Sequence, residues 1–430
     1  MPNVKKVDVL IKMEHPVREF DISCILAVIL ERVYGRTTAI ESMMFRDYET
    51  LCTYEPKVLA VPYLLKNDAG FERFRKYWPN AVFANLAYEQ VFQKVNRNFK
   101  SPAPYMATPP HFYNAWGQFY VDYLLERGVP SEVITINGNP SYSLYREPYR
   151  RGFADKEALG KKHGLDPNKR WIFIPENYQS AFFSEARVQG YIEAGEQERE
   201  IREFIAFGEN SLKAVCEWVK DVPEGVEVIL RPRPATEMSI FRAKVDPWLA
   251  GASPNLHITN DDTVREWILA SDAVASSYST TMLEAAIANK PVFMLKPYPY
   301  PPQVMNDWYE HVDEVKNKPD WVEVMNGLTE KGDWRKLEAY ARGIMMVQDD
   351  PIASMAEWIN GIIAFQEGRP AVASESEMKK LRSKCNMRRI NRAIRKVLLR
   401  QKEKSRMHDF FTQEDVEKGI AKWRKVISQA

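Results

Sequence analysis

Short apolar runs alternate with longer amphipathic segments along the first 310 residues of the chain. The short runs are rich in β-branched and aromatic residues, which indicates strands, whereas apolar residues at a spacing near 3.6 indicate helices. Alternation of strands and helices is typical of βαβ units, and such units build parallel sheets. The pattern therefore predicts an α/β protein with parallel sheets.

The predicted strands form two series, which a polar connection separates. The connection covers residues 160–169, and the strands are expected at 7–12, 37–40, 58–62, 81–85 and 133–137 before it and at 171–175, 226–232, 255–259, 272–277 and 290–295 after it. Helices are expected at 20–34, 70–78, 113–127, 200–222 and 280–289, and the pattern turns helical from 319 to 367.

Two series of this kind predict two Rossmann-like domains that face a central cleft, with a C-terminal helical extension. Ligands of open α/β folds bind beyond the carboxyl ends of the strands, so the cleft is the expected site. We expect an N-terminal domain at residues 1–165, a second domain at 166–318, closing helices at 319–370 and a basic helical tail at 371–430.

Composition agrees with a globular enzyme of the cytoplasm. The chain has 430 residues, of which 45% are hydrophobic and 27% charged, and its formal net charge of +2 gives no global argument for nucleic-acid binding. The longest apolar run, residues 22–30, is about half of the roughly 20 residues that a membrane span requires. The N-terminal segment also lacks the apolar core and cleavage site of a signal peptide.

Cysteine and histidine positions predict neither a disulfide framework nor a metal site. The cysteines Cys24, Cys52, Cys216 and Cys385 lie far apart, and the six histidines are equally dispersed. The sequence also lacks the glycine-rich phosphate loops and the serine-hydrolase motif, so the commonest NTPase, dinucleotide and hydrolase classes are not expected. We therefore expect no metal ion and no resident cofactor.

A candidate phosphate site follows two strands of the second series. Arg231 and Arg233 stand just beyond a strand, and the planar guanidinium suits phosphate oxygens. Ser277, Ser279 and Thr280 stand about forty residues later, where the strand predicted at 272–277 turns into a helix, whose free N–H groups attract anions. Surface ion pairs for the arginines, and a capping box in which Glu284 only satisfies the helix start, are the alternative interpretations.

The stretch "MEHPVREFD" at residues 13–21 separates the first predicted strand from the first helix. It therefore lies at the carboxyl edge of the first sheet, where Glu14, His15 and Asp21 are candidate catalytic groups. A solvated helix start is the alternative, because acidic residues in a first turn are favoured by the helix dipole. We expect Glu19 to be such a solvated residue.

Two further segments follow strands and contain polar side chains. "GNPSY" includes Asn139, and "IPENYQSAFF" includes Asn177, Tyr178 and Ser180. These side chains either line the cleft or simply belong to turns that end their strands.

Together, "HPVREFD", "NLAYEQ", "WGQFYVDYLLERGVP", "INGNP", "IPENYQSAFF", "ILRPRP" and "SSYSTTMLEAAIANKP" resemble bacterial surface-carbohydrate biosynthesis proteins with the GT-B glycosyltransferase fold. The resemblance covers about residues 5–310 and rests on the order and spacing of the motifs. Similar architectures occur in capsule Kdo transferases, CDP-glycerol glycerophosphotransferases and non-hydrolysing UDP-N-acetylglucosamine 2-epimerases.

The resemblance implies that the second half binds a donor nucleotide and the first half an acceptor. Donor contacts would come from Arg231 and Arg233 to phosphates, from Ser277, Ser279 and Thr280 to the nucleotide phosphate, and from Glu284 to ribose. One departure concerns the donor: CMP-sugar transferases of this type often show His-Pro where this chain has Arg231-Pro232.

On the acceptor side the resemblance points to Glu14, His15 and Asp21 as catalytic candidates. The base that takes the acceptor proton would be Glu14 or Asp21. Substrate would be bound by Arg18, Glu89, Asn139, Asn177 and Tyr178.

We therefore expect a metal-independent glycosyltransferase that moves a sugar from a nucleotide-sugar donor to a surface polysaccharide or lipid-linked glycan, as in capsule or lipopolysaccharide synthesis. The sequence does not decide between CMP, CDP, UDP and GDP donors. The alternatives are a nucleotide-sugar 2-epimerase or a CDP-alcohol phosphotransferase of the same fold, and a non-catalytic assembly scaffold.

The segment Lys379–Arg406 is strongly basic, with Glu403 as its single acid, and its apolar residues fall at helical spacing. We expect residues 378–406 to bind an anionic membrane surface, which would place the protein peripherally on the inner face of the cytoplasmic membrane. A helix packed on the protein itself or on a partner is the alternative, and nucleic acid is a third possibility that we do not favour.

Overall fold

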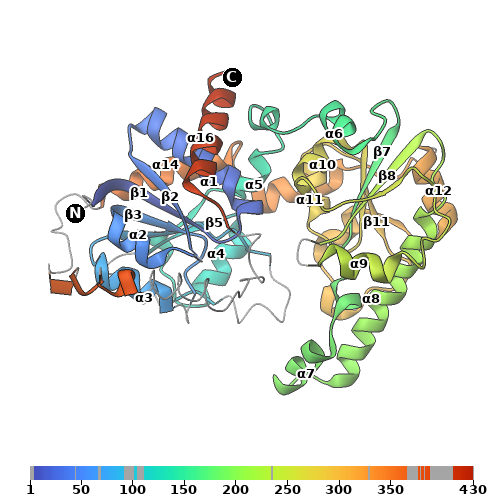
Figure 1. The fold of residues 1–430 in the computed structure, drawn as a ribbon, viewed down its shortest axis with the longest axis horizontal. Coiled ribbons are helices and arrows are strands. Elements are labelled where there is room, and N and C mark those ends of the chain that lie inside the picture. Colours follow the sequence, from blue (N-terminus) through green and yellow to red (C-terminus); the bar gives the residue numbers. More distant parts are fainter. Residues whose placement is uncertain are drawn as a thin grey trace. The chain divides into compact units, whose positions relative to one another are not determined.

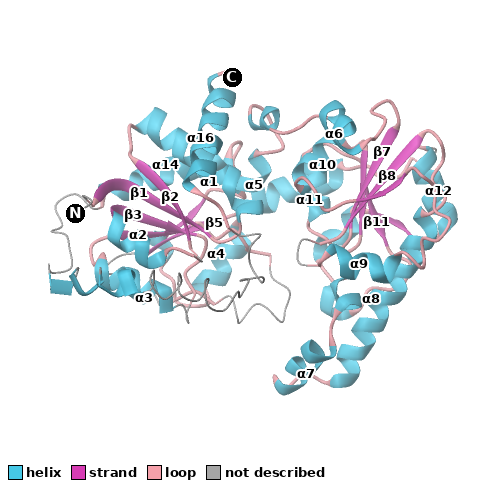
Figure 2. Ribbon diagram, in the orientation of Figure 1, coloured by secondary structure: helices cyan, strands magenta, loops and turns pink. Residues whose placement is uncertain are grey.

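The computed structural model describes residues 4–43, 45–65, 69–91, 101–103, 111–233, 236–327, 330–365, 376–377, 379–381, 383–387 and 410–429. The chain forms two compact units, one built from residues 1–152 and 343–430 and the other from 153–342 (Figure 1). Each unit contains one six-stranded parallel sheet flanked by helices (Figure 2). The predicted α/β class and the two parallel sheets are therefore confirmed.

The first sheet consists of β1 (Lys5–Met13), β2 (Thr38–Ser42), β3 (Tyr54–Val61), β4 (Val82–Asn85), β5 (His111–Ala115) and β6 (Ile134–Ile136). The strands lie in the order β2-β1-β3-β4-β5-β6. The chain adds β2 on one side of β1 and then adds β3 to β6 on the other side. The topological switch point therefore lies between β1 and β3. Switch points of this kind leave a crevice at the carboxyl ends of the strands.

The helices of the first unit are α1 (Pro16–Tyr34), α2 (Asp47–Thr53), α3 (Ala69–Tyr77), α4 (Gln118–Leu125), α5 (Pro140–Ser143), α14 (Pro351–Ala364) and α16 (Gln413–Ser428). Helix α1 starts with Pro16, which lacks the N–H that a first helical residue leaves unpaired, and it ends at the left-handed Gly35. Its apolar run from residue 22 to 30 is buried, because α14 and α16 both pack on this helix.

Helix α16 is an integral part of the first unit. Trp423 is fully buried, and its indole N–H donates to Asp21 Oδ1 at 2.9 Å. Gly419 allows close approach to α1, since a Cβ at this position would lie 2.5 Å from the Phe20 ring. The predicted tail at residues 371–430 is thus not a single peripheral element, because residues 410–429 pack on the first unit.

The second sheet consists of β7 (Arg170–Pro175), β8 (Val226–Arg231), β9 (Leu256–Ile258), β10 (Ala273–Ser276), β11 (Val292–Leu295) and β12 (Asp313–Val315). Its order is β12-β11-β10-β7-β8-β9, which puts the switch point between β7 and β10. The helices are α6 (Lys156–His163), α7 (Glu185–Glu193), α8 (Glu198–Val219), α9 (Met238–Val245), α10 (Val264–Ala270), α11 (Thr281–Ile287), α12 (Lys318–Asn326) and α13 (Arg335–Ala341).

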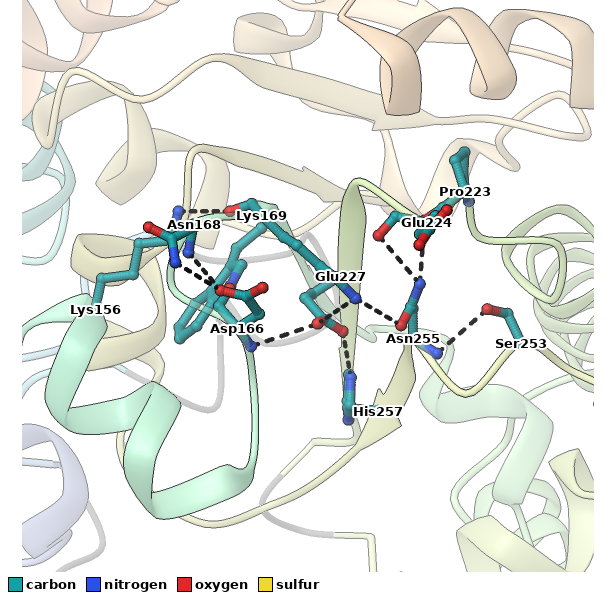
Figure 3. A network of polar contacts seen from close by, with 11 residues as sticks. Lys156, Asp166, Asn168, Lys169, Pro223, Glu224, Glu227, Ser253, Asn255 and His257 are labelled. Atoms are coloured by element: carbon teal, nitrogen blue, oxygen red, sulfur yellow. Dashed lines mark hydrogen bonds and ion pairs between the residues drawn. The ribbon is translucent and has the colours of Figure 1, made fainter.

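A polar network joins the amino ends of β7, β8 and β9 (Figure 3). The carboxylate of Glu227 is almost fully buried and lies 3.1 Å from Lys169 Nζ and 2.6 Å from His257 Nε2. Lys169 Nζ also donates to Asn255 Oδ1 at 3.0 Å. The network lies at the sheet edge opposite the one where ligands of such folds bind, and it ties three strands together.

Two strands differ from the sequence prediction. Residues 113–115 belong to strand β5, although the sequence predicted a helix from 113 to 127; the helix α4 begins only at Gln118. The aromatic run before Gly117 shows neither a helical nor a strand periodicity. The predicted helix was therefore drawn too long at its start and included part of strand β5. Strand β12 was not predicted, because its three residues, Asp-Glu-Val, include only one apolar side chain.

The predicted domain borders also differ from the two units. The first unit ends at residue 152 and is completed by residues 343–430, so the helical segment predicted at 319–370 is divided between the units. Helix α14 returns to the first sheet, where Asp350 accepts hydrogen bonds from Ser143 at 2.9 Å and from Tyr149 at 2.8 Å. Such a return crossover joins distant sequence segments and leaves no compositional mark.

Most of the predicted membrane-binding segment at 378–406 lies outside the described residues. Within it, residues 379–381 and 383–387 are helical, and Leu381 and Cys385 are buried. In the described part of the chain, no helix combines the length and apolar character needed to cross a membrane. All four cysteines are described, and each is a free thiol.

Candidate functional site

A pocket lies at the carboxyl ends of β1, β3 and β4, at the switch point of the first sheet. We call it the first-unit pocket. It is lined by Glu14, Arg18, Glu19, Pro62, Tyr63, Leu64, Leu65, Asn85, Ala87, Tyr88, Glu89, Pro102 and Tyr120. Three predicted site residues, Glu14, Arg18 and Glu89, are therefore brought together, although 71 residues separate Arg18 from Glu89 in the chain.

The loop that supplies Tyr88 and Glu89 to this pocket is held by buried amides. Asn85 Oδ1 accepts the Ala87 N–H at 3.0 Å, and Ala87 has a φ of 48°, a left-handed backbone that is unfavourable for alanine. Gln90 Nε2 donates to the Ala87 carbonyl at 3.1 Å, and Asn114 Nδ2 donates to the Leu86 carbonyl at 3.0 Å. The amides fix a strained loop beside the pocket.

Glu19 lines this pocket and is only 1% exposed. Its Oε2 accepts the Glu14 N–H at 2.8 Å, and its Oε1 lies 4.0 Å from Arg18 Nη2. Burial raises the pKa of Glu19 to about 7, because desolvation outweighs the stabilisation of the charge by these two groups. The sequence prediction of a solvated Glu19 is wrong, because the fold buries this side chain beside Tyr88.

The charged groups around Glu19 form a short chain. Arg18 Nη1 donates to Glu89 Oε1, and both side chains are about two-fifths exposed. Glu14 is less exposed, and its Oε2 lies 3.5 Å from His15 Nε2. His15 is the residue that precedes α1 and does not contribute to the pocket lining.

Two other predicted residues serve the fold of the first unit at different positions. Asp21 faces α16, where Trp423 donates to it and Lys422 Nζ lies 3.6 Å away. Asn139 is the N-cap of α5: its side chain accepts the Ser141 N–H at 3.0 Å. Both residues are absent from the lining of the first-unit pocket.

A second group of polar residues lies at the switch point of the second sheet. We call it the second-unit cluster, and its members are Glu176, Asn177, Arg233, Ser277 and Tyr278. Ser276 Oγ donates to the Pro175 carbonyl at 2.6 Å, and Asn177 Nδ2 donates to the Tyr278 carbonyl at 3.3 Å. These contacts tie the carboxyl ends of β7 and β10 together.

Glu176 directly follows the central strand β7 and is 5% exposed. Its Oε1 accepts the Tyr178 N–H, and its own N–H donates to the Arg231 carbonyl at 2.9 Å. Its Oε2 has no hydrogen-bond partner among the described residues. Burial raises the pKa of Glu176 to about 7, against the Tyr178 N–H and the charge and backbone N–H of Arg233, although the Arg233 N–H makes no hydrogen bond of normal geometry to Oε2. A buried carboxyl oxygen without a partner is costly, which favours a ligand contact here.

The two predicted phosphate-binding arginines differ in environment. Arg231 is 4% exposed, and its Nη2 donates to the carbonyls of Asn260 at 3.2 Å and Asp262 at 2.9 Å. Arg231 therefore fixes the loop after β9. Arg233 is only partly buried, and its Nη1 donates to Gln179 Oε1 at 2.7 Å. A guanidinium has five N–H donors, so Arg233 retains donors for a ligand.

The predicted hydroxyl cradle follows β10 but is only partly open. Ser277 is buried, whereas Ser279 and Thr280 are more exposed. Ser279 Oγ accepts the Thr281 N–H at 3.3 Å, so a serine turn precedes α11. The N-cap of α11 is Thr280, and its side chain makes no capping hydrogen bond.

Tyr178 belongs to the hydrophobic core of the second unit. It is 2% exposed, and its hydroxyl donates to the Leu295 carbonyl at 3.3 Å. The predicted cleft-lining residue thus points inward, because the short turn after β7 buries every other side chain. Asn177, its neighbour, remains half-buried at the sheet edge.

Sequence reasoning missed Glu19, Glu176 and the buried amides Asn85, Gln90, Asn114 and Asn137. A partial signal existed for Glu176, since a carboxylate that directly follows a fully buried central strand is unusual. In the described residues, no three His, Cys, Asp or Glu side chains gather in a way that would hold a metal ion.

No protein-family profile matches the chain, and no curated protein matches it in sequence. Solved structures do match. The wall teichoic acid polymerase TagF aligns with a TM-score of 0.55 at 12% identity, over 85% of this chain and 91% of that one. A candidate UDP-N-acetylglucosamine 2-epimerase from Listeria monocytogenes aligns with a TM-score of 0.51 at 14% identity, over 85% and 98%.

A third match is the S. aureus MnaA–UDP co-structure, with a TM-score of 0.50 at 14% identity, over 86% of this chain and 100% of that one. At these identities the likeness establishes the fold. The chain has the two-unit α/β fold of GT-B proteins, as the sequence predicted.

Proposed function

We propose that this protein is a nucleotide-sugar-dependent glycosyltransferase of surface-carbohydrate synthesis. The second-unit cluster would bind the donor nucleotide, and the first-unit pocket would bind the acceptor. The names of the solved relatives support a nucleotide-sugar theme: they include a candidate UDP-N-acetylglucosamine 2-epimerase, a complex with UDP and a teichoic acid polymerase.

The observation that best supports a donor site is the position of Glu176 and Arg233 at the switch point between β7 and β10. Arg233 offers charged N–H donors to a diphosphate, and Glu176 Oε2 offers a buried acceptor to a ribose hydroxyl or a base N–H. Departure of a nucleotide leaves negative charge on the phosphate, and a guanidinium at that place stabilises it.

Nucleotide binding is tested by thermal shift with CMP, CDP, UDP, GDP and their sugars. A nucleotide that binds only the folded protein raises the melting temperature. Arg233→Gln should weaken that nucleotide about 10- to 100-fold, the effect of losing one charge-assisted hydrogen bond. If no nucleotide raises the melting temperature of the wild-type protein, the donor-site proposal is wrong.

Two arginines serve as controls for this experiment. Arg242→Gln, on the exposed face of α9, should leave nucleotide binding unchanged, since Arg242 pairs with Asp246. Arg231→Gln should lower the melting temperature without ligand, because the carbonyls of residues 260 and 262 lose their donor. Equal losses of binding in all three variants would indicate a general structural effect.

An epimerase of the same fold is the second candidate, because two of the three reported structural matches carry an epimerase name or a bound UDP. Incubation with a nucleotide sugar alone separates the two functions. A transferase needs an acceptor for rapid turnover, whereas an epimerase forms its product without one. Rapid conversion without an acceptor would refute the transferase.

Membrane association through residues 378–406 is part of the proposal. Each basic residue near an anionic surface contributes about 1 kcal/mol of attraction. The test is a variant with glutamine in place of the basic residues from 388 to 406, because deletion through α16 would expose the buried face of α1. Loss of sedimentation with vesicles containing phosphatidylglycerol is expected, and unchanged sedimentation would contradict the proposal.

A further inference from the structure

We propose that Glu19 is the residue that takes the acceptor proton, and that the first-unit pocket accepts an uncharged, hydroxyl-rich ligand. This inference rests on the proposed transferase function and assigns its base to a residue outside the sequence candidates Glu14 and Asp21. It also names the class of acceptor.

The geometry separates Glu19 from Asp21 by position and from Glu14 by burial. Glu14 also lines the pocket, but its side chain is 13% exposed, against 1% for Glu19. Glu19 lines the pocket, whereas Asp21 faces α16 and is held by Trp423. Glu19 stands in the first turn of α1, which β1 and its loop orient, and the Glu14 N–H fixes one of its oxygens at 2.8 Å. The carboxylate also interacts with the His15 N–H, and its other oxygen lies 4.0 Å from Arg18 Nη2. A carboxylate has about four acceptor sites, so Glu19 keeps acceptor capacity for a hydroxyl group.

The charges of the described lining define the ligand class. They consist of three carboxyl groups, Glu14, Glu19 and Glu89, and one guanidinium, Arg18, which Glu89 already engages. A phosphate or carboxylate ligand would meet net negative charge here. Sugar hydroxyl groups are donors that carboxylates accept.

A purely structural role for Glu19 is the competing explanation. Its bond to the Glu14 N–H resembles the contact by which a Glu or Gln side chain caps a helix start. A capping oxygen works equally well in an amide, so glutamine would replace glutamate in that role. Proton transfer requires the carboxylate, and this difference makes the two roles separable.

In the proposed step, the acceptor O–H gives its proton to the Glu19 carboxylate while the acceptor oxygen forms a bond to the anomeric carbon. The bond from that carbon to the donor phosphate oxygen breaks, and its electron pair leaves with the nucleotide. Glu19 later releases the proton to water. The step uses only the nucleotide sugar and the hydroxyl, and it changes no oxidation state.

The groups that face Glu19 come from every neighbouring element. Glu14 and His15 before α1, Arg18 on α1 and Tyr88 after β4 interact with Glu19 directly. Behind them, Glu89 pairs with Arg18, and Ser23 interacts with Tyr88. Burial raises the pKa of Glu19 to about 7 in these surroundings. A base with this pKa is half ionised near neutral pH, so the rate should rise through pH 7 and level off above it.

The experiment measures nucleotide release from UDP-, CMP-, CDP- and GDP-sugars, with methyl glycosides or water as the hydroxyl acceptor. Glu19→Gln should lower kcat about 100- to 10,000-fold, abolish the rise near pH 7 and leave the nucleotide-induced thermal shift intact. Glu31→Gln, an exposed residue of the same helix paired with Arg424, is the control and should retain the wild-type rate and profile.

Each result decides the proposal. A Glu19→Gln variant with the wild-type rate and pH profile would refute Glu19 as base while the proposed function stands. Loss of the rise near pH 7 in Glu14→Gln instead would transfer the role to Glu14. If the wild-type protein releases no nucleotide from any donor, both the function and the assignment fail. Preference for phosphorylated over neutral glycosides would refute the ligand class.

Discussion

Glu176 makes the stability of the second unit depend on pH in a direction opposite to that of most carboxylates. Its ordinary pKa of 4.5 rises to about 7 in the folded protein, where burial dominates. Between these two values the folded protein holds a proton that the unfolded chain has released. The free energy of unfolding therefore falls as pH rises from about 4.5 to 7, and the loss is complete above 7.

The magnitude follows from the two pKa values. At about 1.4 kcal/mol for each pH unit, the interval from 4.5 to about 7 corresponds to about 3 kcal/mol. Glu176→Gln removes this dependence, because an amide does not titrate. The unfolding free energy of Glu176→Gln minus that of the wild-type protein should therefore increase by about 3 kcal/mol between pH 4.5 and pH 8.

The assay must distinguish the two units, since Glu19 produces a similar dependence in the first one. Urea unfolding followed by pulsed hydrogen–deuterium exchange does so when peptides from β7 and β8 are analysed. Glu185→Gln, on exposed α7, is the control. Arg202 lowers the pKa of Glu185, so its small effect should have the opposite sign. A difference between Glu176→Gln and wild type that stays constant from pH 5 to 8 would refute the argument.

Three further predictions concern buried contacts. Trp423→Ala should destabilise the first unit by about 3–5 kcal/mol, which urea titration would measure. It should also expose α16 to proteases. Unchanged cleavage in limited proteolysis would contradict the docking of α16. Asn114→Ala should lower the unfolding free energy of the first unit by about 1–3 kcal/mol for each group that it leaves unpaired. Isothermal titration should show that it weakens acceptor binding more than nucleotide binding. Glu227→Gln should lower the stability of the second unit by about 1–3 kcal/mol without changing nucleotide affinity, and a loss of affinity would contradict a purely structural network.

Local pattern determined the secondary structure of this protein to a large extent. Strands β1, β3, β7, β8 and β11 are apolar runs that parallel sheets bury on both faces, so composition alone identified them. Strand β5 was missed because aromatic residues suit a buried strand and a buried helix equally well. Its assignment depended on pairing with β4 and β6.

Some residues of the candidate site were also predicted from the sequence. Strand order placed Glu14 at the carboxyl edge of the first sheet, and the resemblance implied Arg18 and Glu89 as substrate-binding residues. The structure brings all three into one pocket. Strand order also placed Arg233 at the edge of the second sheet. The positions of Glu14 and Arg233 follow from the order and direction of the strands, which the local sequence pattern predicts.

The tertiary structure alone decided which of these groups is buried. Glu19 is an ordinary first-turn acid in sequence, yet the fold buries it beside Tyr88, and burial raises its pKa. Asp21, two residues later, points to α16, about four hundred residues away in the chain. Desolvation and pairing depend on contacts between distant segments, and no local pattern records them. For that reason the sequence located the edge where chemistry is expected, and only the packed fold distinguished the pocket carboxylate from the structural one.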